Sequence, residues 1–188
     1  MLIVATGADD AVAGQLGLPC RGGSMISGAQ LIAGTGDLSE VEVHVGRAVA
    51  PGGFAWAVPA NGHGSRVGLL CRGDPRAPLA RFATRLERRG AIRRTGAPVR
   101  YRAVPSGPRT PSFTERTLLI GDAAGQVKST TSGGIYYGLL GAEAAVSAVD
   151  RALRTRDASA EALSTYEHRW LTLLGGEQRT GRLLRGLQ

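Results

Sequence analysis

The spacing of apolar residues changes along this chain, and the change is sharpest after residue 117. Residues 117–120, Thr-Leu-Leu-Ile, form a short unbroken run bounded by glycine, which is typical of a strand buried on both faces. From residue 135 the apolar positions recur at intervals of three and four, as on one face of a helix of about four turns; they are Ile135, Leu139, Ala142, Val146 and Val149. Asp122 and several glycines lie between the two runs. The segment therefore predicts a strand, an acidic turn, a glycine-rich loop and a helix.

Between residues 24 and 70 the apolar positions alternate with other residues. Valines at 41, 43 and 45 point one way and Glu42 and His44 the other, which predicts an antiparallel strand with one apolar and one wet face. Phe54, Trp56 and Val58 alternate with two alanines, and an apolar run follows at 67–70. Turn signals at 51–53 and 61–64 separate these runs. We expect a β-meander that buries one apolar face. A further short strand is expected at residues 2–4.

Helical patterns flank and follow the meander. Residues 11–21 predict a short helix and turn, and residues 78–94 predict an amphipathic helix that Gly90 interrupts or ends. Residues 101–114, with three prolines, predict a crossing loop. Ser159 is expected to cap a last helix that Gly175 and Gly176 break. The apolar side of that helix is predicted to consist of Ala162, Leu163, Tyr166, Trp170, Leu173 and Leu174.

The composition of the 188 residues is that of a globular protein with a real core, since 43% of them are hydrophobic. No apolar run reaches the roughly 18 residues of a membrane span, and the opening run meets Gly7 and two aspartates too soon for a signal peptide. We therefore expect a cytoplasmic protein. Cys20 and Cys71 are far apart and the three histidines are scattered, so neither a disulfide nor a metal site is predicted.

The formal charge of +8 is concentrated in one region. Between residues 72 and 102 ten arginines are accompanied only by Asp74 and Glu87. A solvated helix face is the main interpretation of this excess. An anionic partner, such as a diphosphate or a membrane surface contacted peripherally, is the alternative, whereas nucleic acid is not expected because nearly all the basic residues are arginine in an Ala- and Gly-rich chain.

The chemistry of the segment after residue 120 follows from its order. Asp122 comes directly after a buried strand, where open α/β sheets bind ligands. Ala123, Ala124 and Gly125 keep the backbone accessible, and the helix that starts after residues 133–134 offers unpaired amides with partial positive charge. A carboxylate repels phosphate, so the site favours a ligand with hydroxyl groups and hydrogen-bond acceptors, which a flavin provides. A P-loop does not fit, and glycines that merely permit tight packing remain an alternative.

The sequence GDAAGQVKSTTSGGIYYGLL, residues 121–140, resembles the flavin-contacting segment of the geranylgeranyl reductase family, flavoproteins of the p-hydroxybenzoate hydroxylase fold that saturate isoprenoid double bonds. Ser129 replaces a usual proline and Ser132 a usual glycine. The segment at residues 7–10 resembles the family's Gly-Ala-Asp-Gly, with Asp10 in place of the last glycine. The resemblance implies FAD as cofactor, bound by Asp9, Gly121, Asp122, Ala124, Gly125, Gly133, Gly134 and Ile135.

A second resemblance lies in the meander. FAWAVP, then eight residues, then Gly68 is similar to the Tyr-x-Trp-x-Phe-Pro and Gly-x-Gly signature of the family's substrate domain. It implies that an isoprenoid or lipid substrate contacts residues of the strand pair, namely Phe54, Trp56, Val58, Pro59 and Gly68. An ordinary core strand is the alternative for these aromatic residues.

Together these observations predict an α/β fold, α+β overall. It contains a partial FAD/NAD(P)-binding, Rossmann-like parallel sheet (residues 1–21 and 115–156), an inserted antiparallel substrate domain (22–114) and a C-terminal helical segment (157–188). The sequence contains no Gly-x-Gly-x-x-Gly unit, so the resemblance implies a chain that corresponds to the middle and later part of a protein roughly twice as long.

The implied activity is FAD-dependent reduction of C=C bonds in isoprenoid chains, with NAD(P)H or a ferredoxin-like protein as electron donor. No catalytic proton donor is identified. The alternatives are a flavin-dependent monooxygenase or halogenase of the same fold, a non-catalytic remnant, or a basic module that binds an anionic polymer.

Overall fold

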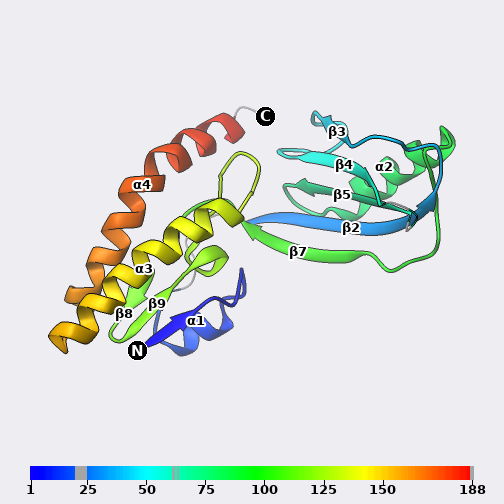
Figure 1. Ribbon diagram of the computed structural model, residues 1–188. Helices are drawn as coiled ribbons and strands as arrows, with labels where there is room; N and C mark the ends of the chain where they lie inside the picture. Colours follow the sequence, from blue (N-terminus) through cyan, green and yellow to red (C-terminus); the bar gives the residue numbers. More distant parts are fainter. Residues whose placement is uncertain (20–24, 61, 63, 187–188) are drawn as a thin grey trace. The chain divides into compact units, whose positions relative to one another are not determined.

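A computed structural model of the chain describes residues 1–19, 25–60, 62 and 64–186, so Cys20, Ser24 and much of the expected turn at 61–64 lie outside the described residues. The chain divides into two compact units. One contains Met1–Ser24 and Pro105–Leu184, and the other contains Met25–Val104 and Arg185–Gln188. Figure 1 labels most of their helices and strands. The predicted fold class is confirmed: a sheet with a parallel strand pair, an antiparallel sheet and C-terminal helices are all present.

The sheet of the first unit is built on the unbroken apolar run. Strand β9 (Thr117–Leu119) is central, in the order β1-β9-β8. It pairs in parallel with β1 (Leu2–Val4), which places Val4 beside Leu119, and antiparallel with β8 (Phe113–Thr114). Leu118 and Leu119 are fully buried, because both faces of the strand are covered. The strand predicted at residues 117–120 is therefore confirmed.

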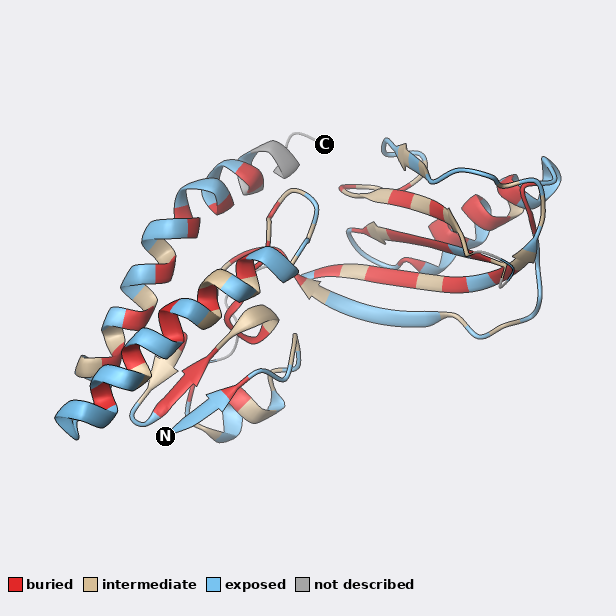
Figure 2. Ribbon diagram, in the orientation of Figure 1, coloured by how far each residue is buried: buried red, intermediate tan, exposed pale blue. Residues whose placement is uncertain are grey.

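Helices account for the rest of this unit. They are α1 (Ala11–Gln15), the 3₁₀ turn η1 (Gly121–Ala124), α3 (Ile135–Thr155) and α4 (Ala160–Gly186). Ser159 caps α4 as predicted, since its hydroxyl accepts a hydrogen bond of 3.2 Å from the amide of Ala162. Figure 2 shows the buried stripes along α3 and α4, and their residues form one cluster with β9: Leu118, Tyr137, Ala144, Ala145, Ala148, Ala152, Leu163, Tyr166, Trp170 and Leu174.

The predicted buried face of α3 is wrong for its larger residues except Val149, which is partly buried and packs against the core cluster. Ile135, Leu139 and Val146 are between 65% and 86% exposed, whereas the face that packs inward consists of Tyr137 and of small residues around Gly141 and Ala148. The cause is that α3 lies very close to the Gln126 side chain, which a Cβ at Gly141 would overlap. The prediction was based on the spacing of the larger side chains, but the smaller side chains of α3 are the ones that pack against the rest of the unit.

The predicted break in α4 at Gly175 and Gly176 is also wrong, because the helix runs through both glycines to Gly186. Two glycines lower helix propensity by roughly 1 kcal/mol each, but contacts beyond them hold the helix in place. The Gln178 side chain is buried and donates hydrogen bonds of 2.9 Å to the carbonyl oxygens of Gly125 and Val127. Leu173, placed on the apolar side by the sequence, is 56% exposed.

A buried polar network joins α4 to the end of β9. The Tyr166 hydroxyl donates to the carbonyl of Leu119 and accepts a 2.8 Å hydrogen bond from the Gln126 side-chain amide. The Gln126 carbonyl in turn accepts a 2.7 Å hydrogen bond from the amide of Gly121. Burial raises the pKa of Tyr166 well above its usual value, so the hydroxyl stays protonated and available as a donor. One tyrosine thus fixes where β9 ends and the following turn begins.

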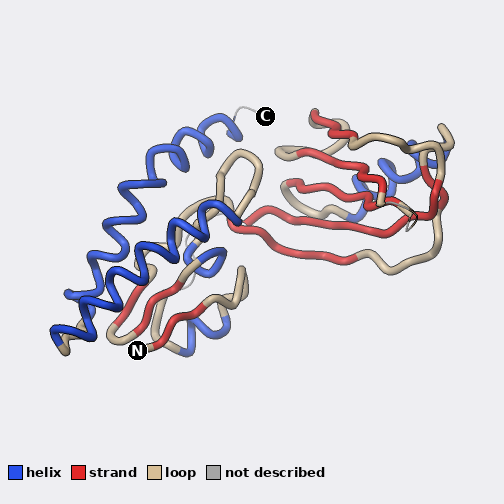
Figure 3. Tube along the Cα trace, in the orientation of Figure 1, coloured by secondary structure: helices blue, strands red, loops and turns tan. Residues whose placement is uncertain are grey.

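The second unit is an antiparallel sheet with one helix. Strands β2 (Met25–Thr35), β3 (Glu42–Val45), β4 (Phe54–Pro59), β5 (Ser65–Cys71) and β6 (Ile92–Arg93) lie in the order β3-β4-β5-β2-β6, and β7 (Arg100–Pro105) also pairs with β2. Helix α2 (Arg76–Arg88) contributes its apolar side to the same core. Figure 3 separates the strands from the helix by colour. The meander predicted for β3, β4 and β5 is confirmed.

The core of this unit depends on alanine. Ala55 and Ala57 of β4 are fully buried and belong to one cluster with Leu79, Phe82 and Leu86 of α2. Phe54, Trp56 and Val58, which alternate with these alanines, are only partly buried and lie outside the cluster. The small residues therefore face the helix, and the aromatic residues lie on the opposite face of the sheet.

The faces of β3 are reversed relative to the prediction. Val41, Val43 and Val45 are 61–75% exposed. Glu42 instead accepts a hydrogen bond from Arg89, the residue directly after α2, and the His44 ring lies 4.9 Å from that of Phe82 in α2. Burial opposes the charge of Glu42, but hydrogen bonds from His44 and Arg89 hold the pKa of its carboxyl below its usual value. Arg85 and Arg89 therefore hold the polar side of β3 toward α2.

Three predicted boundaries need correction. Helix α2 starts at Arg76 and ends at Arg88, and Gly90 follows with φ +78°, so the helix is shorter at its end than residues 78–94. The expected loop at 101–114 contains most of β7 and all of β8. Helix α1 covers only the first part of residues 11–21. In the described part of the chain no helix is long and apolar enough to cross a membrane.

Replacing Tyr166 by Phe is expected to lower the free energy of unfolding by about 1–3 kcal/mol, because the Leu119 carbonyl and the Gln126 amide would both lose a buried partner. Urea denaturation followed by circular dichroism measures the change. Tyr136→Phe is the matched control, since that tyrosine is 65% exposed and the same substitution there should leave the midpoint unchanged. Equal midpoints for the two variants would contradict the role given to the network.

Candidate functional site

The turn after β9 is shaped by glycine. Gly121 has φ +62° and Gly125 has φ +70°, conformations that other residues adopt only with strain. At Gly125 a Cβ would also overlap the carbonyl oxygen of Gly107, and the amide of Arg109 bonds the Ala124 carbonyl at 2.9 Å. The returning segment 107–109 therefore lies directly against η1. This contact explains why residue 125 is a glycine, whether or not a ligand binds nearby.

Asp122 lies against the start of α3. Its side chain is partly buried in the first turn of η1, and a Cβ added at Gly134 would come within 2.9 Å of its Oδ1 atom. Gly134 is the N-cap residue of α3 and has no side chain with which to cap the helix. The Asp122 carboxylate and the start of α3 are thus neighbours.

The loop from Lys128 to Gly133 is closed by its own backbone. The Lys128 amide donates to the Gly133 carbonyl at 2.9 Å, and the Ser132 amide donates to the Lys128 carbonyl at 2.8 Å. Ser132 has φ +58°, in the left-handed region where a non-glycine residue costs roughly 1–2 kcal/mol. Glycine, which the resembled family has at this position, would adopt the same φ without that cost. Gly133 has open space around it, its nearest neighbour for a Cβ being the Thr131 hydroxyl at 3.6 Å.

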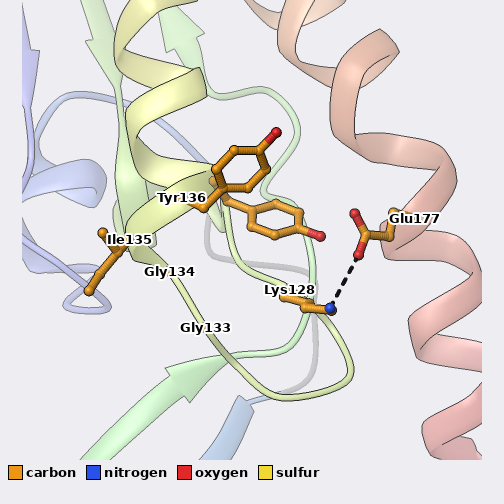
Figure 4. Close-up of a pocket in the computed structure, with 7 residues that line it drawn as sticks. Lys128, Gly133, Gly134, Ile135, Tyr136 and Glu177 are labelled. Carbon is orange, nitrogen blue, oxygen red and sulfur yellow. Dashed lines mark ion pairs between the residues drawn. The ribbon is translucent and has the colours of Figure 1, made fainter.

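A cavity of about 410 Å³ opens beside this loop (Figure 4). It is lined by Lys128, Gly133, Gly134, Ile135, Tyr136, Tyr137 and Glu177. Three of the residues predicted from the sequence, Gly133, Gly134 and Ile135, are thus brought together at one wall. Lys128 and Glu177 also line the cavity but were not predicted from the sequence. Glu177 had no detectable signal, because it reaches the site from α4 and that helix was expected to break before it.

Asp9, the remaining predicted cofactor residue, is exposed and accepts a 2.9 Å hydrogen bond from the amide of Ala11 at the start of α1. Its neighbour Asp10 pairs with Arg109, whose side chain is 2% exposed and also donates to the Pro19 carbonyl at 2.7 Å. The buried arginine therefore joins the end of β1 and α1 to the segment that packs on Gly125. A lone arginine in a proline-rich loop gave no sequence signal for this role.

Four of the predicted substrate residues, Phe54, Trp56, Val58 and Gly68, lie on the sheet face opposite α2, whereas Pro59 ends the strand at a position that alternates with them. Trp56 is paired with Gly68 across β4 and β5, and a Cβ at Gly68 would overlap the indole ring. The indole amide donates to the Gln30 side chain at 3.3 Å, and the Phe54 and Trp56 rings lie 5.8 Å apart. Val58 and Pro59 continue this strand and are partly buried. Gly68 thus allows a large aromatic side chain to lie flat on the sheet.

The two groups of residues have different chemistry. The first unit offers a carboxylate for hydroxyl groups, helix amides for acceptor atoms and a space without side chains at Gly133 and Gly134. The second offers an apolar surface of aromatic and branched side chains. Within the described residues no three His, Cys, Asp or Glu side chains gather as a metal ion would require.

Comparison with curated sequences finds relatives that are named digeranylgeranylglycerophospholipid reductases. The chain is 33% identical to the digeranylgeranylglycerophospholipid reductase of Methanocaldococcus jannaschii over 144 residues, which cover 71% of the chain and 35% of that protein. It is also 33% identical to digeranylgeranylglycerophospholipid reductase 2 of Methanothermobacter thermautotrophicus over 183 residues, covering 93% of the chain and 47% of that protein. The chain thus matches a third to a half of the length of these relatives. No protein-family model matches it.

Among solved structures, the chain is similar to a geranylgeranyl bacteriochlorophyll reductase-like protein from Thermoplasma acidophilum. The TM-score is 0.85 with 20% sequence identity, and the match covers 99% of the chain and 49% of that protein. At this identity the likeness establishes the fold.

Replacing Gly125 by Ala is expected to lower the free energy of unfolding by about 2–4 kcal/mol, because a Cβ would meet both an unfavourable φ and the Gly107 carbonyl. Gly176→Ala is the control: it lies inside α4 with no neighbour within 4 Å of its would-be Cβ, so it should raise stability by about 0.5–1 kcal/mol. Chemical denaturation of both variants measures the changes. Tolerance of alanine at residue 125 would refute the close packing of segment 107–109.

Proposed function

This chain belongs to the geranylgeranyl reductase family, and on that premise we propose that it is part of a flavin-dependent oxidoreductase that reduces C=C bonds of isoprenoid lipid chains. The observation that carries the proposal is the position of the Asp122 carboxylate against Gly134, at the start of α3. Because the chain spans only a third to a half of its relatives' length, the activity is proposed for a protein that also supplies what they have outside the matched region.

FAD is the proposed cofactor, and the residues present fit the sugar and ring portion of it. Asp122 would accept a hydrogen bond from a hydroxyl of the ribityl chain, a charge-assisted contact worth about 1.5–3 kcal/mol. The amides of Gly134 and Ile135 would face the acceptor atoms of the pyrimidine edge, and Gly133 leaves room for the ring. Gly121 and Asp9 are the further proposed contacts, whereas Ala124 and Gly125 are buried and are proposed to shape the turn that presents Asp122.

The isoprenoid chain is proposed to lie on the open sheet face of the second unit. Phe54, Trp56 and Val58 form its apolar surface, with Gly68 beneath the indole and Pro59 at the strand end. The exposed valines Val43 and Val45 of β3 extend that surface, since Val43 pairs with Trp56 and Val45 with Phe54. An apolar chain laid there would remove these side chains from water, at about 25 cal/mol per Å².

When bound, reduced flavin would supply the hydride for one carbon of the double bond. The protein would orient the two reactants and exclude water from them, and a proton must reach the other carbon. No described side chain is assigned as the donor of that proton. The electron donor is proposed to be NAD(P)H or a ferredoxin-like protein, and the lipid substrate favours peripheral contact with a membrane.

The competing reaction class on the same fold is oxygenation or halogenation of a ring substrate. The products separate the two classes, because saturation adds a pair of hydrogen atoms to each bond, whereas the alternatives add oxygen or halogen. Mass analysis of a prenyl lipid incubated with the reduced, flavin-loaded enzyme would decide between them, and incorporation of oxygen would overturn the proposed reaction.

Asp122→Ala is expected to weaken FAD binding about 10-fold or more, because the hydrogen bond to the ribityl chain would be lost. Flavin fluorescence titration measures the dissociation constant. The control is Asp150→Ala, at an exposed carboxylate that pairs only with Arg154 on the surface of α3 and should leave binding unchanged. Equal affinities for wild type and Asp122→Ala would remove the observation on which the cofactor assignment depends.

Prenyl binding should be visible in the fluorescence of Trp56, because the chain has only two tryptophans and Trp170 is fully buried. Adding geranylgeraniol is expected to shift the emission of the wild type to shorter wavelength. In Trp56→Phe, which keeps an aromatic ring but removes the reporter, the shift should vanish. A shift that persists in this variant would place the lipid elsewhere.

A further inference from the structure

The cavity beside α3 contains an ionic group that the proposed function leaves unexplained. The Lys128 ammonium lies 3.7 Å from the Glu177 carboxylate, as the dashed line in Figure 4 shows. Tyr137, which is 4% exposed, also lines this cavity, and the Glu177 carboxylate contributes to raising the pKa of its hydroxyl. We call Lys128, Glu177 and Tyr137 the cavity cluster. A positive charge, a negative charge and a phenol therefore line the same cavity as Gly133, Gly134 and Ile135.

The backbone fixes the positions of Lys128 and Glu177. The amide and the carbonyl of Lys128 both form hydrogen bonds within the closed 128–133 loop. The preceding residue, Val127, is fully buried. Glu177 precedes Gln178, whose side-chain amide bonds the Gly125 and Val127 carbonyls. The same two hydrogen bonds that dock α4 on this loop thus set the separation of the two charges. The pair is a built feature of the fold, although both side chains are about half exposed.

The partners of Glu177 leave the lysine charge available to the cavity. Burial and the neighbouring carboxylate raise the pKa of Tyr137 far above its usual value, so its hydroxyl remains protonated at any physiological pH. The 3.7 Å separation between the Lys128 ammonium and the Glu177 carboxylate is longer than a good hydrogen bond. Lys128 therefore keeps donors that can reach a ligand in the cavity.

We infer that Lys128 makes the cavity favour the reduced form of a bound flavin and that Glu177 limits this preference. The inference rests on the proposed function, and it assigns to the chain a control over the redox state of the cofactor. The isoalloxazine ring is uncharged when oxidised and carries negative charge on its pyrimidine edge when reduced. Gly133 to Ile135 and Lys128 line one cavity, so an ammonium there attracts the reduced ring selectively.

The size of the effect follows from Coulomb's law. A unit charge several ångströms from the ring edge, in a site about half open to water, changes the ratio of the affinities for reduced and oxidised ring roughly 3- to 10-fold. Salt should weaken the effect without abolishing it, because the pair is only partly screened. Glu177 acts through Lys128 and is a positioning residue in this scheme.

Riboflavin is the suitable probe, because it contains the ring and ribityl chain but no phosphate that could contact a lysine on its own. Anaerobic titrations with oxidised and with dithionite-reduced riboflavin give the ratio of the two dissociation constants. The full chain is compared with Lys128→Met, Lys128→Arg and Glu177→Gln, and circular dichroism confirms that each variant is folded. Lys128→Arg retains the charge and serves as the matched control.

The preference for reduced riboflavin should fall roughly 3- to 10-fold in Lys128→Met, be retained in Lys128→Arg and rise in Glu177→Gln, while affinity for the oxidised form changes little. Opposite signs for the lysine and glutamate variants would separate an electrostatic effect from loss of packing. An unchanged ratio in Lys128→Met would overturn the inference and leave the proposed flavin site standing. Absence of any riboflavin binding, with Asp122→Ala equal to wild type, would overturn the proposed function itself.

Discussion

The docking of α4 on the segment between β9 and α3 is the interaction on which the candidate site depends. Tyr166 fixes the end of β9, Gln126 fixes the amide of Gly121, and Gln178 fixes the carbonyls of Gly125 and Val127. A segment rich in glycine has a high conformational entropy when unfolded. The hydrogen bonds from a long helix order it without covering Gly133 and Gly134. A site with little side-chain bulk therefore gains its shape from residues that lie behind it.

The sequence predicted the parts of the site that are local. A buried strand, an acid at its end, small residues and then a helix are consecutive in the chain, and each follows from spacing and residue type. The residues that were not predicted come from distant parts of the chain. Glu177 and Gln178 lie beyond the two glycines that were expected to end the last helix, and Arg109 lies in a loop. Propensity describes neighbours along the chain, whereas these residues are placed by contacts that only the folded protein has.

The errors about faces have two physical origins. In α3 the larger apolar residues were expected to be inside, yet Ala144 and Ala148 occupy the core, and in β4 the core is likewise formed by the small residues Ala55 and Ala57. Small residues are buried where backbones approach closely, which leaves Ile135, Trp56 and their neighbours on accessible faces. In β3 Arg89 and Arg85 reversed the expected sides by engaging Glu42 and His44. Alternation and helical period identify two faces, but charge and closeness of approach decide which one is covered.

The exposed side of α3 has a practical consequence. Ile135, Leu139, Val146 and Leu153 recur along that helix, each between 65% and 86% exposed, and Leu2 and Ile3 at the edge strand β1 are nearly half exposed. Apolar area of this kind promotes self-association and adsorption of a protein in dilute buffer. Handling this chain therefore calls for low concentration, mild detergent or glycerol, and light-scattering checks before any spectroscopic titration is interpreted.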